Sequence, residues 1–271
     1  YVDTPLLSVP TLTQRVNKQG FTKFNLAQLT ERSEQERAKT LLVVQDPFTS
    51  FYDAKSVEAM MVLAKNLGFD PILLPFKPNG KPQHVKGFLT KFAKTATNAA
   101  QFLNHLAELS IPMVGMDASL ALCYRDEYQQ ILGEKRGNFN VMLPHEWIMS
   151  MSPSLASLSL SSDVTFKLFA HCTEKTALPK SEQQWLDIFS QLGLSLDKVS
   201  VGCCGMAGTY GHEASNFDNS KGLFELSWQG QLDALDDEQV LVTGFSCRSQ
   251  AKRFANVQSR HPVEALAQLT S

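Results

Sequence analysis

Short apolar runs alternate with amphipathic stretches through residues 41–132, which is typical of strands and helices that follow one another. The run "LLVVQ" at 41–45 is too short for a helix and rich in β-branched residues, so it predicts a buried strand. Apolar residues at helical spacing through 53–67 precede Gly68 and favour a helix with a glycine cap. In this half we expect strands at 41–45, 71–76 and 112–116 and helices at 53–67, 84–109 and 119–132.

The same alternation returns after residue 163. Ser181 and Gln184 have the spacing of a capping box and predict that a helix starts at 182. Because strands that alternate with helices usually pair in parallel, we predict an α/β fold with an internal duplication, in two pseudo-equivalent parallel-sheet, Rossmann-like halves. In the second half we expect strands at 166–170, 198–201 and 239–243 and helices at 182–192, 220–235 and 247–256.

Weak internal matches support the duplication. Glycine positions recur 125 residues apart, as Gly68 and Gly193 and as Gly80 and Gly205. After a further slip of three residues Ser119 aligns with Cys247, and Asp46 falls within one residue of the position equivalent to Cys172. We infer that only the second copy kept its thiols.

The chain divides into four expected segments. We predict a connector from an upstream part at 1–40, a first half at 41–149, a Ser-rich link at 150–162 and a second half at 163–271. The first residue is Tyr1 rather than methionine, which indicates a piece of a longer polypeptide.

Composition excludes several classes of function. The 271 residues are 43% hydrophobic and 19% charged with a formal net charge of −2, which argues against a nucleic-acid partner. No run approaches the roughly 18 apolar residues of a membrane span, and no signal peptide opens the chain, so we expect a cytoplasmic protein. Five cysteines are too few for a disulfide scaffold, and four of them follow residue 171. This clustering predicts a site.

The four clustered cysteines are Cys172, Cys203, Cys204 and Cys247. Each follows a predicted strand, so all four should meet at the carboxyl edge of a parallel sheet, where such folds bind ligands. Gathered thiolates need a cation or a cluster, and both iron–sulfur centres and zinc use such ligands. Gly205 would let the backbone turn around a bulky group. A metal-free thiol site and simple burial of the cysteines remain as alternatives.

Three strings carry a resemblance to a known family: "HCTE" at 171–174, "CCGMAGTYGHE" at 203–213 and "TGFSCRSQ" at 243–250. In this order they resemble the cysteine-rich CCG domain of large bacterial FAD-linked oxidases of the D-lactate or D-2-hydroxyglutarate dehydrogenase type. Related domains occur in the B subunit of heterodisulfide reductase, in the iron–sulfur subunit of glycolate oxidase and in the C subunit of anaerobic glycerol-3-phosphate dehydrogenase. The resemblance spans roughly residues 40–258.

The resemblance implies an electron-transfer domain within a flavin-dependent 2-hydroxy-acid dehydrogenase. The four cysteines would hold a [4Fe–4S] cluster, with zinc as the alternative. FAD would sit in a part of the parent that is absent here, so this chain alone should be inactive. Its partners would be the flavin and ferredoxin-like domains of the parent and an electron acceptor. Gln250 departs from the family pattern, because a further cysteine is expected at this place after Cys247.

Other residues are secondary candidates. His171, His212 and Arg248 flank the cysteines and could act as ligands, proton carriers or anion contacts. In the first half we expect Asp46, Asp117 and Ser119 to line a degenerate site through hydrogen bonds. Cys123 lies on a predicted helix and is expected to be a core residue, with a role as an extra ligand as the alternative.

Overall fold

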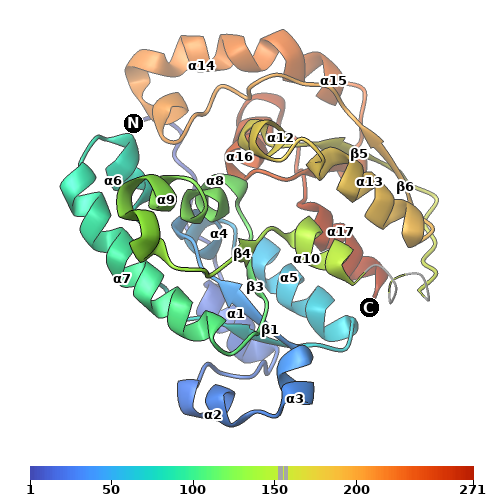
Figure 1. Cartoon of the computed structure of the whole chain (residues 1–271). Helices are drawn as coiled ribbons and strands as arrows, with labels where there is room; N and C mark the ends of the chain where they lie inside the picture. Colours follow the sequence, from blue (N-terminus) through green and yellow to red (C-terminus); the bar gives the residue numbers. More distant parts are fainter. Residues whose placement is uncertain (152–154, 156–157) are drawn as a thin grey trace. The chain divides into compact units, whose positions relative to one another are not determined.

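The computed structural model describes residues 1–151, 155 and 158–271, and these divide into two compact units (Figure 1). Unit 1 comprises Tyr1–Leu7 and Ile148–Ser271, and unit 2 comprises Ser8–Trp147. Part of the predicted Ser-rich link, residues 152–154 and 156–157, lies outside the described residues. Among the residues described, no helix is long and apolar enough to cross a membrane.

Unit 2 is built on a parallel sheet of four strands in the order β2-β1-β3-β4. The strands are β1 (Thr40–Val44), β2 (Asp70–Leu73), β3 (Met113–Gly115) and β4 (Val141–Met142). Every residue of β1 is buried, which explains its continuous apolar run. The helices are α1 (Leu12–Lys18), α2 (Leu26–Glu31), α3 (Glu34–Ala38), α4 (Pro47–Tyr52), α5 (Ala54–Asn66), α6 (Lys81–Val85), α7 (Leu89–Ala107), α8 (Ala118–Ala121) and α9 (Glu127–Leu132). Helix α10 (Pro144–Ser150) leads from unit 2 into unit 1.

Unit 1 has a parallel sheet of three strands in the order β6-β5-β7. The strands are β5 (Thr165–Phe169), β6 (Ser195–Lys198) and β7 (Val240–Val242). The helices are α12 (Cys172–Ala177), α13 (Ser181–Gln191), α14 (Phe217–Phe224), α15 (Gly230–Leu232), α16 (Phe245–Ala255) and α17 (Pro262–Leu269), with a π-helical turn at Glu225–Gln229. The predicted α/β class with two parallel sheets is confirmed.

The duplication is visible in the backbone. Gly68 and Gly193 have φ of +82° and +80°, and Gly80 and Gly205 have φ of +81° and +83°. All four therefore adopt the left-handed conformation that favours glycine. The first two strands of each half also keep one spacing, because Leu42 pairs with Ile72 as Lys167 pairs with Asp197, each 125 residues further on.

In the structure, the third strands of the two halves align one residue away from the predicted alignment. Val114 in β3 pairs with Val43, and Leu241 in β7 pairs with Leu168, so the third strands are 127 positions apart rather than 128. With this spacing Cys247 corresponds to Leu120 instead of Ser119.

Several predicted boundaries were wrong. Strand β6 lies at 195–198 instead of 198–201, because the chain leaves the sheet after the hydrogen bond from Val199 N–H to the Leu168 carbonyl. The predicted capping box is absent at α13, because Ser181 is already helical and the preceding Lys180 has no short side-chain acceptor. The predicted helix 119–132 is divided into α8, a short 3-10 turn and α9.

Candidate functional site

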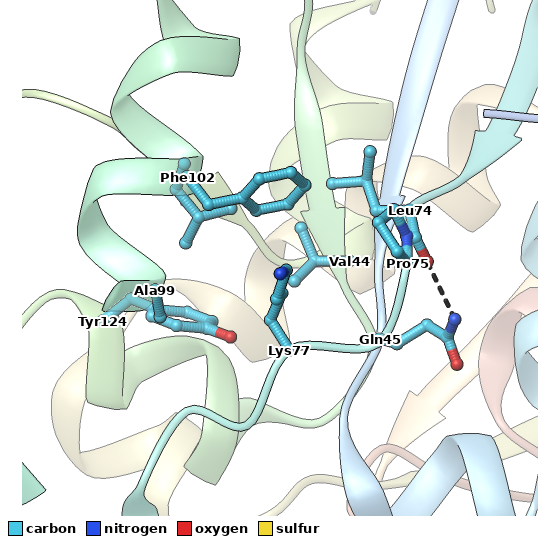
Figure 2. Close-up of a pocket in the computed structure, with 9 residues that line it drawn as sticks. Val44, Gln45, Leu74, Pro75, Lys77, Ala99, Phe102 and Tyr124 are labelled. Atoms are coloured by element: carbon cyan, nitrogen blue, oxygen red, sulfur yellow. Dashed lines mark hydrogen bonds between the residues drawn. The ribbon is translucent and has the colours of Figure 1, made fainter. Parts of the chain in front are cut away.

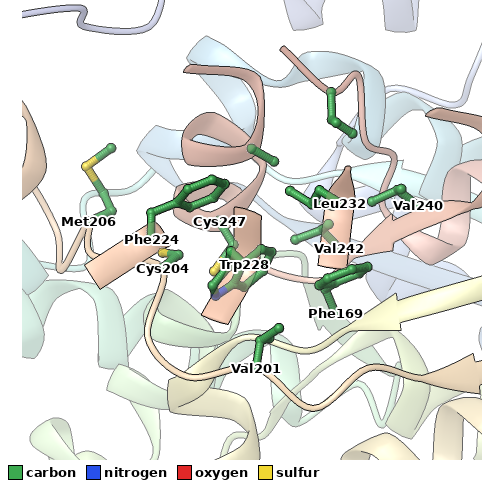
Figure 3. Packing of buried hydrophobic residues seen from close by; sticks show 12 residues of the cluster. Phe169, Val201, Cys204, Met206, Phe224, Trp228, Leu232, Val240, Val242 and Cys247 are labelled. Carbon is green, nitrogen blue, oxygen red and sulfur yellow. The ribbon is translucent and has the colours of Figure 1, made fainter. Parts of the chain in front are cut away.

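The four predicted cysteines lie beyond the carboxyl ends of the three strands of unit 1. Cys172 is the first residue of α12 after β5, and Cys247 lies in the first turn of α16 after β7. Cys203 and Cys204 lie in the loop after β6. Cys203 is exposed, whereas Cys204 and Cys247 are buried beside Trp228 in the core of the unit (Figure 3). The site thus has one solvent-facing side and one dry side.

The sulfur atoms contact one another in series. Cys203 hydrogen-bonds Cys172 and Cys204, and Cys204 also hydrogen-bonds Cys247. Hydrogen bonds from the Cys172 and Cys204 thiols hold the pKa of Cys203 far below its usual range, while the same contacts and burial raise the pKa of Cys172 and Cys204. Negative charge in the thiol form of the site therefore concentrates on Cys203.

Backbone amides also point at the sulfurs. Gly205 N–H donates to Cys203 Sγ at 3.3 Å, and the N–H groups of Thr173 and Met206 donate to Cys172 and Cys204. Each of these bonds lowers the pKa of the cysteine that accepts it, because it stabilises the thiolate. Three of the four sulfurs are therefore supplied with a donor by the main chain.

The loop that carries Cys203 and Cys204 is held by side chains from other elements. Lys175 Nζ donates to the Val201 carbonyl at 2.7 Å, and Trp228 Nε1 donates to the Gly202 carbonyl at 3.1 Å. Ser227 Oγ accepts from Gly202 N–H at 3.0 Å. Ser227 and Trp228 lie on the π-helical turn, a feature often found at functional sites.

Sequence reasoning missed these supporting residues, because a serine and a tryptophan in an amphipathic stretch are indistinguishable from surface and core residues. Gly205 lies in a left-handed turn, while its predicted role beside a bulky group stays a prediction. A Cβ there would lie 2.3 Å from the Ser220 carbonyl oxygen, and its φ of +83° disfavours other residues.

His171 lies next to the site as a helix cap. Its Nδ1 accepts from Thr173 N–H at 3.2 Å, its Nε2 lies 3.2 Å from Ser246 Oγ, and its main-chain N–H donates to Thr243 Oγ1. Gly244 is required beneath it, because a Cβ at Gly244 would lie 2.2 Å from the His171 ring. The ring thus joins the starts of α12 and α16.

His212 and Arg248 each contact main-chain carbonyls. His212 Nδ1 lies 3.1 Å from the Val2 carbonyl oxygen, and burial lowers the pKa of the imidazole. Arg248 Nη1 donates to the carbonyls of Val242 and Thr243 at 2.8 and 3.1 Å and so secures the end of β7. In this arrangement both side chains make main-chain contacts that stabilise the fold.

The first-half candidates form a buried polar group in unit 2. Asp46 Oδ1 accepts from the N–H groups of Phe48 and Thr49 at 2.8 Å, and Asp117 Oδ1 accepts from Ser119 N–H and Oγ at 3.0 and 2.5 Å. Burial, followed by the charge of Asp117, raises the pKa of Asp46 to about 7. The two carboxylates are N-caps of α4 and α8.

Cys123 is buried in unit 2, as predicted for a core residue, and burial raises the pKa of its thiol to about 12. A separate small pocket in this unit lies at the carboxyl ends of β1 and β2 (Figure 2). Val44, Leu74 and Phe102 give it apolar walls. None of the predicted site residues lines it.

The cysteine donor set fits a thiophilic metal or an iron–sulfur group, since four sulfurs with backbone N–H donors lie at one sheet edge. Within the described residues, however, no group of three or more His, Cys, Asp or Glu side chains surrounds a common point as metal ligands would. The thiols instead contact each other in the series Cys172, Cys203, Cys204 and Cys247. The four thiols are thus chemically suitable ligands for such a group, but in the described residues they are not arranged around a common point.

Comparison with known proteins identifies relatives among dehydrogenases, although no family model matches the chain. The chain is 54% identical over 268 residues to a D-2-hydroxyglutarate dehydrogenase of Pantoea ananatis and 53% identical over 268 residues to that of Escherichia coli K12. Each match covers 99% of this chain and 26% of the relative. The C subunit of the anaerobic glycerol-3-phosphate dehydrogenase of Escherichia coli K12 is 24% identical over 197 residues, covering 70% of this chain and 48% of that protein.

These matches confirm the predicted resemblance to D-2-hydroxyglutarate dehydrogenases and to the glycerol-3-phosphate dehydrogenase subunit. They do not identify the CCG domain itself, which stays a prediction. The chain is thus similar to oxidoreductases and spans about a quarter of the length of the D-2-hydroxyglutarate dehydrogenases that it matches.

Proposed function

We propose that this chain is an electron-transfer module of a flavin-dependent D-2-hydroxyglutarate dehydrogenase. In this proposal Cys172, Cys203, Cys204 and Cys247 hold an iron–sulfur cluster, and FAD and the hydroxy acid bind in another part of the parent protein. The chain alone would then bind the cluster without oxidising a substrate.

One observation carries the proposal: cysteines from three separate strand ends bring their sulfurs into contact at one edge of a sheet. Thiols gathered from so far apart in the sequence have no need of one another for packing, because a single buried cysteine packs as a small apolar side chain. The similarity to dehydrogenases supports a redox role for this thiol cluster.

The residues of the chain divide the work of such a site. The thiolates would bind the iron atoms, and the bound group would supply a one-electron carrier. The N–H groups of Thr173, Gly205 and Met206 would stabilise negative charge on the sulfurs. Trp228 and its apolar neighbours exclude water from the side of Cys204 and Cys247. The exposed Cys203 leaves the other side open to an electron partner.

Two alternatives use the same residues. Four thiolates are also a ligand set for structural zinc, which would make the domain a stabilising or docking module of the same parent. The lowered pKa of Cys203 and its exposure instead favour a metal-free reactive thiol.

The deciding experiment is elemental analysis with an absorption spectrum on protein purified without oxygen. The cluster predicts several irons with matching sulfide and a broad band near about 400 nm. One zinc per chain and no colour would refute the cluster and support the zinc-stabilised structural module. Metal-free protein whose Cys203 is alkylated rapidly, and which takes up no iron and sulfide on reconstitution, would favour the thiol site. Cys123→Ser is the matched control and should leave all three readouts unchanged.

A further inference from the structure

Gln250 is a fully buried polar side chain placed against the cysteine loop. It lies three residues after Cys247 in α16, and none of its surface is exposed. Its Nε2 donates to the Cys204 carbonyl at 2.9 Å and to Ser220 Oγ at 2.9 Å. Arg253 Nη1 lies 3.4 Å from Gln250 Oε1, which fits the orientation of the amide with nitrogen toward the loop.

Ser220 in α14 extends this contact to the next peptide. Its hydroxyl accepts from Gln250 and donates to the Gly205 carbonyl at 2.9 Å. Ser220 is also fully buried. Two consecutive carbonyls of the loop, those of Cys204 and Gly205, are therefore held by side chains from two helices.

The direction of these carbonyls fixes the direction of two N–H groups. In a trans peptide the C=O and the N–H point to opposite sides of the chain. The peptide whose carbonyl is held by Gln250 presents Gly205 N–H to Cys203 Sγ. The peptide whose carbonyl is held by Ser220 presents Met206 N–H to Cys204 Sγ.

We propose that Gln250 and Ser220 are positioning residues for the cysteine site, which hold two peptide planes so that their N–H groups donate to the sulfurs of Cys203 and Cys204. Each side chain acts through a main-chain carbonyl rather than through a sulfur. The effect on a bound metal rests on the proposed function, whereas the effect on the thiols themselves does not.

Burial supports this role over simple packing. A buried amide costs free energy unless its hydrogen bonds are made, so an apolar residue would fill the same space with a smaller penalty. The Gln250 amide instead directs both of its N–H donor contacts to the loop and to Ser220. Outer hydrogen bonds of this kind typically change metal affinity by about 10- to 100-fold when removed.

The test uses the whole chain with Gln250→Met, which keeps the length of the side chain, with Ser220→Ala, and with Gln258→Met as an exposed control. In metal-free, reduced protein, the rates of iodoacetamide labelling at Cys203 and Cys204 are measured by peptide mass spectrometry, with Cys247 as the buried reference in the same unit. Binding of Co²⁺ alone is measured by its absorption as a second readout.

We expect Gln250→Met to slow labelling of Cys203 and Ser220→Ala to slow labelling of Cys204, each about fivefold relative to Cys247, because the thiolate that loses its N–H donor is less stable. Co²⁺ affinity should fall about tenfold, with the control unchanged. Accelerated labelling of Cys247 together with Cys203 or Cys204 would mean general opening of unit 1 and would overturn the proposal, as would unchanged labelling in both variants. If the unmutated chain binds no Co²⁺, the proposed metal site is refuted. The labelling rates relative to Cys247 still decide whether Gln250 and Ser220 position the peptides.

Discussion

The two halves share a backbone plan but place different chemistry at the same sheet edge. In unit 1 the carboxyl ends of the strands carry four thiols, and in unit 2 the corresponding positions are Pro47, Pro78, Asn79 and Leu120. The carboxylates Asp46 and Asp117 do not replace thiols. They occupy the helix-cap positions that His171 and Gly244 occupy in unit 1.

This difference teaches that the helix caps and the thiols are separable parts of the shared backbone plan. The caps start the helices after β1, β3, β5 and β7, and both halves keep them. The thiols stand one to three residues further along or in the loop after the second strand, and only unit 1 has them. The turns at the strand ends therefore form both with and without thiols beside them.

The largest effect should come from removing thiols. The double variant Cys203→Ser/Cys204→Ser should lose more than about 100-fold in affinity for Co²⁺, since half of the sulfur donors disappear. Pro78→Ser/Asn79→Ser changes the corresponding loop of unit 2 and should leave the affinity unchanged. Titration followed by absorption measures both. Equal losses in the two variants would contradict a site confined to unit 1.

The glycines after the second strands should differ in their effect on stability. Gly205→Ala should lower the free energy of unfolding by about 3 kcal/mol or more, because the left-handed φ and a backbone contact at 2.3 Å both oppose a Cβ. Gly80→Ala should lower it by about 2 kcal/mol, since the closest atom belongs to the Phe92 side chain rather than to the main chain. Urea unfolding gives both values.

The helical site Gly222→Ala is the control for these glycine variants, because nothing lies within 4 Å of its added Cβ. It should be neutral or stabilising by up to about 1 kcal/mol. A Gly205→Ala variant as stable as the Gly222→Ala variant would show that the turn can relax.

The buried carboxylate Asp46 of unit 2 should make the stability of the protein depend on pH. The folded-state pKa of Asp46 is raised from 3.8 to about 7, so the folded state holds the proton more tightly than the unfolded chain. Stability contributed by this group is present at pH below about 4 and is lost as pH rises toward about 7. The stability of Asp46→Asn relative to the wild type should therefore rise by up to about 4 kcal/mol between pH 4 and pH 8.

Buried His145 changes stability in the opposite direction over part of this range. Burial lowers its pKa to about 4, so its contribution is lost as pH falls below its unfolded value of 6.5. The comparison of Asp46→Asn with wild type at each pH cancels this background. Asp163→Asn, an exposed change, should give a flat difference, and a flat difference for Asp46→Asn as well would refute the shared burial of the two carboxylates.

The smallest effects concern the aromatic donors to the loops. Tyr128 Oη donates to the Asn79 carbonyl at 2.8 Å in unit 2, as Trp228 Nε1 donates to the Gly202 carbonyl in unit 1. Tyr128→Phe should cost about 1 kcal/mol of stability without changing thiol labelling. Trp228→Phe should also raise the labelling rate of Cys203. Acceleration of Cys203 by Tyr128→Phe would argue that the loops are not independent.

Local signals explain what the sequence could predict. The buried strand β1 and the glycine cap after α5 each depend on residues that are adjacent in the sequence. The cysteines could be identified as site candidates from their residue type. Strand β6 was misplaced because three of its four residues, Ser195, Asp197 and Lys198, are exposed, so main-chain pairing with β5 and not apolar burial defines it.

The contacts that support the cysteine loop could not be predicted from the sequence for another reason. Gln250, Ser220 and Trp228 meet the cysteine loop across 15 to 46 positions of sequence, and nothing in their spacing marks them. In the sequence, Gln250 is notable only because a cysteine is expected at its position. In the fold, its side chain contacts the main chain of the cysteine loop.

Unit 1 consists of two segments that are separated in the sequence, which limits how the protein can be cut into its units. Unit 1 takes residues from both sides of unit 2, because Val2 N–H donates to the His212 carbonyl and Asp3 pairs with Arg253. No single proteolytic cleavage can therefore yield either unit whole. A cut near residue 148 alone leaves Tyr1–Leu7 of unit 1 covalently attached to unit 2, so the fragment that carries the cysteines would retain its own N-terminal segment only by non-covalent contacts. Clean separation takes a second cut near residue 7.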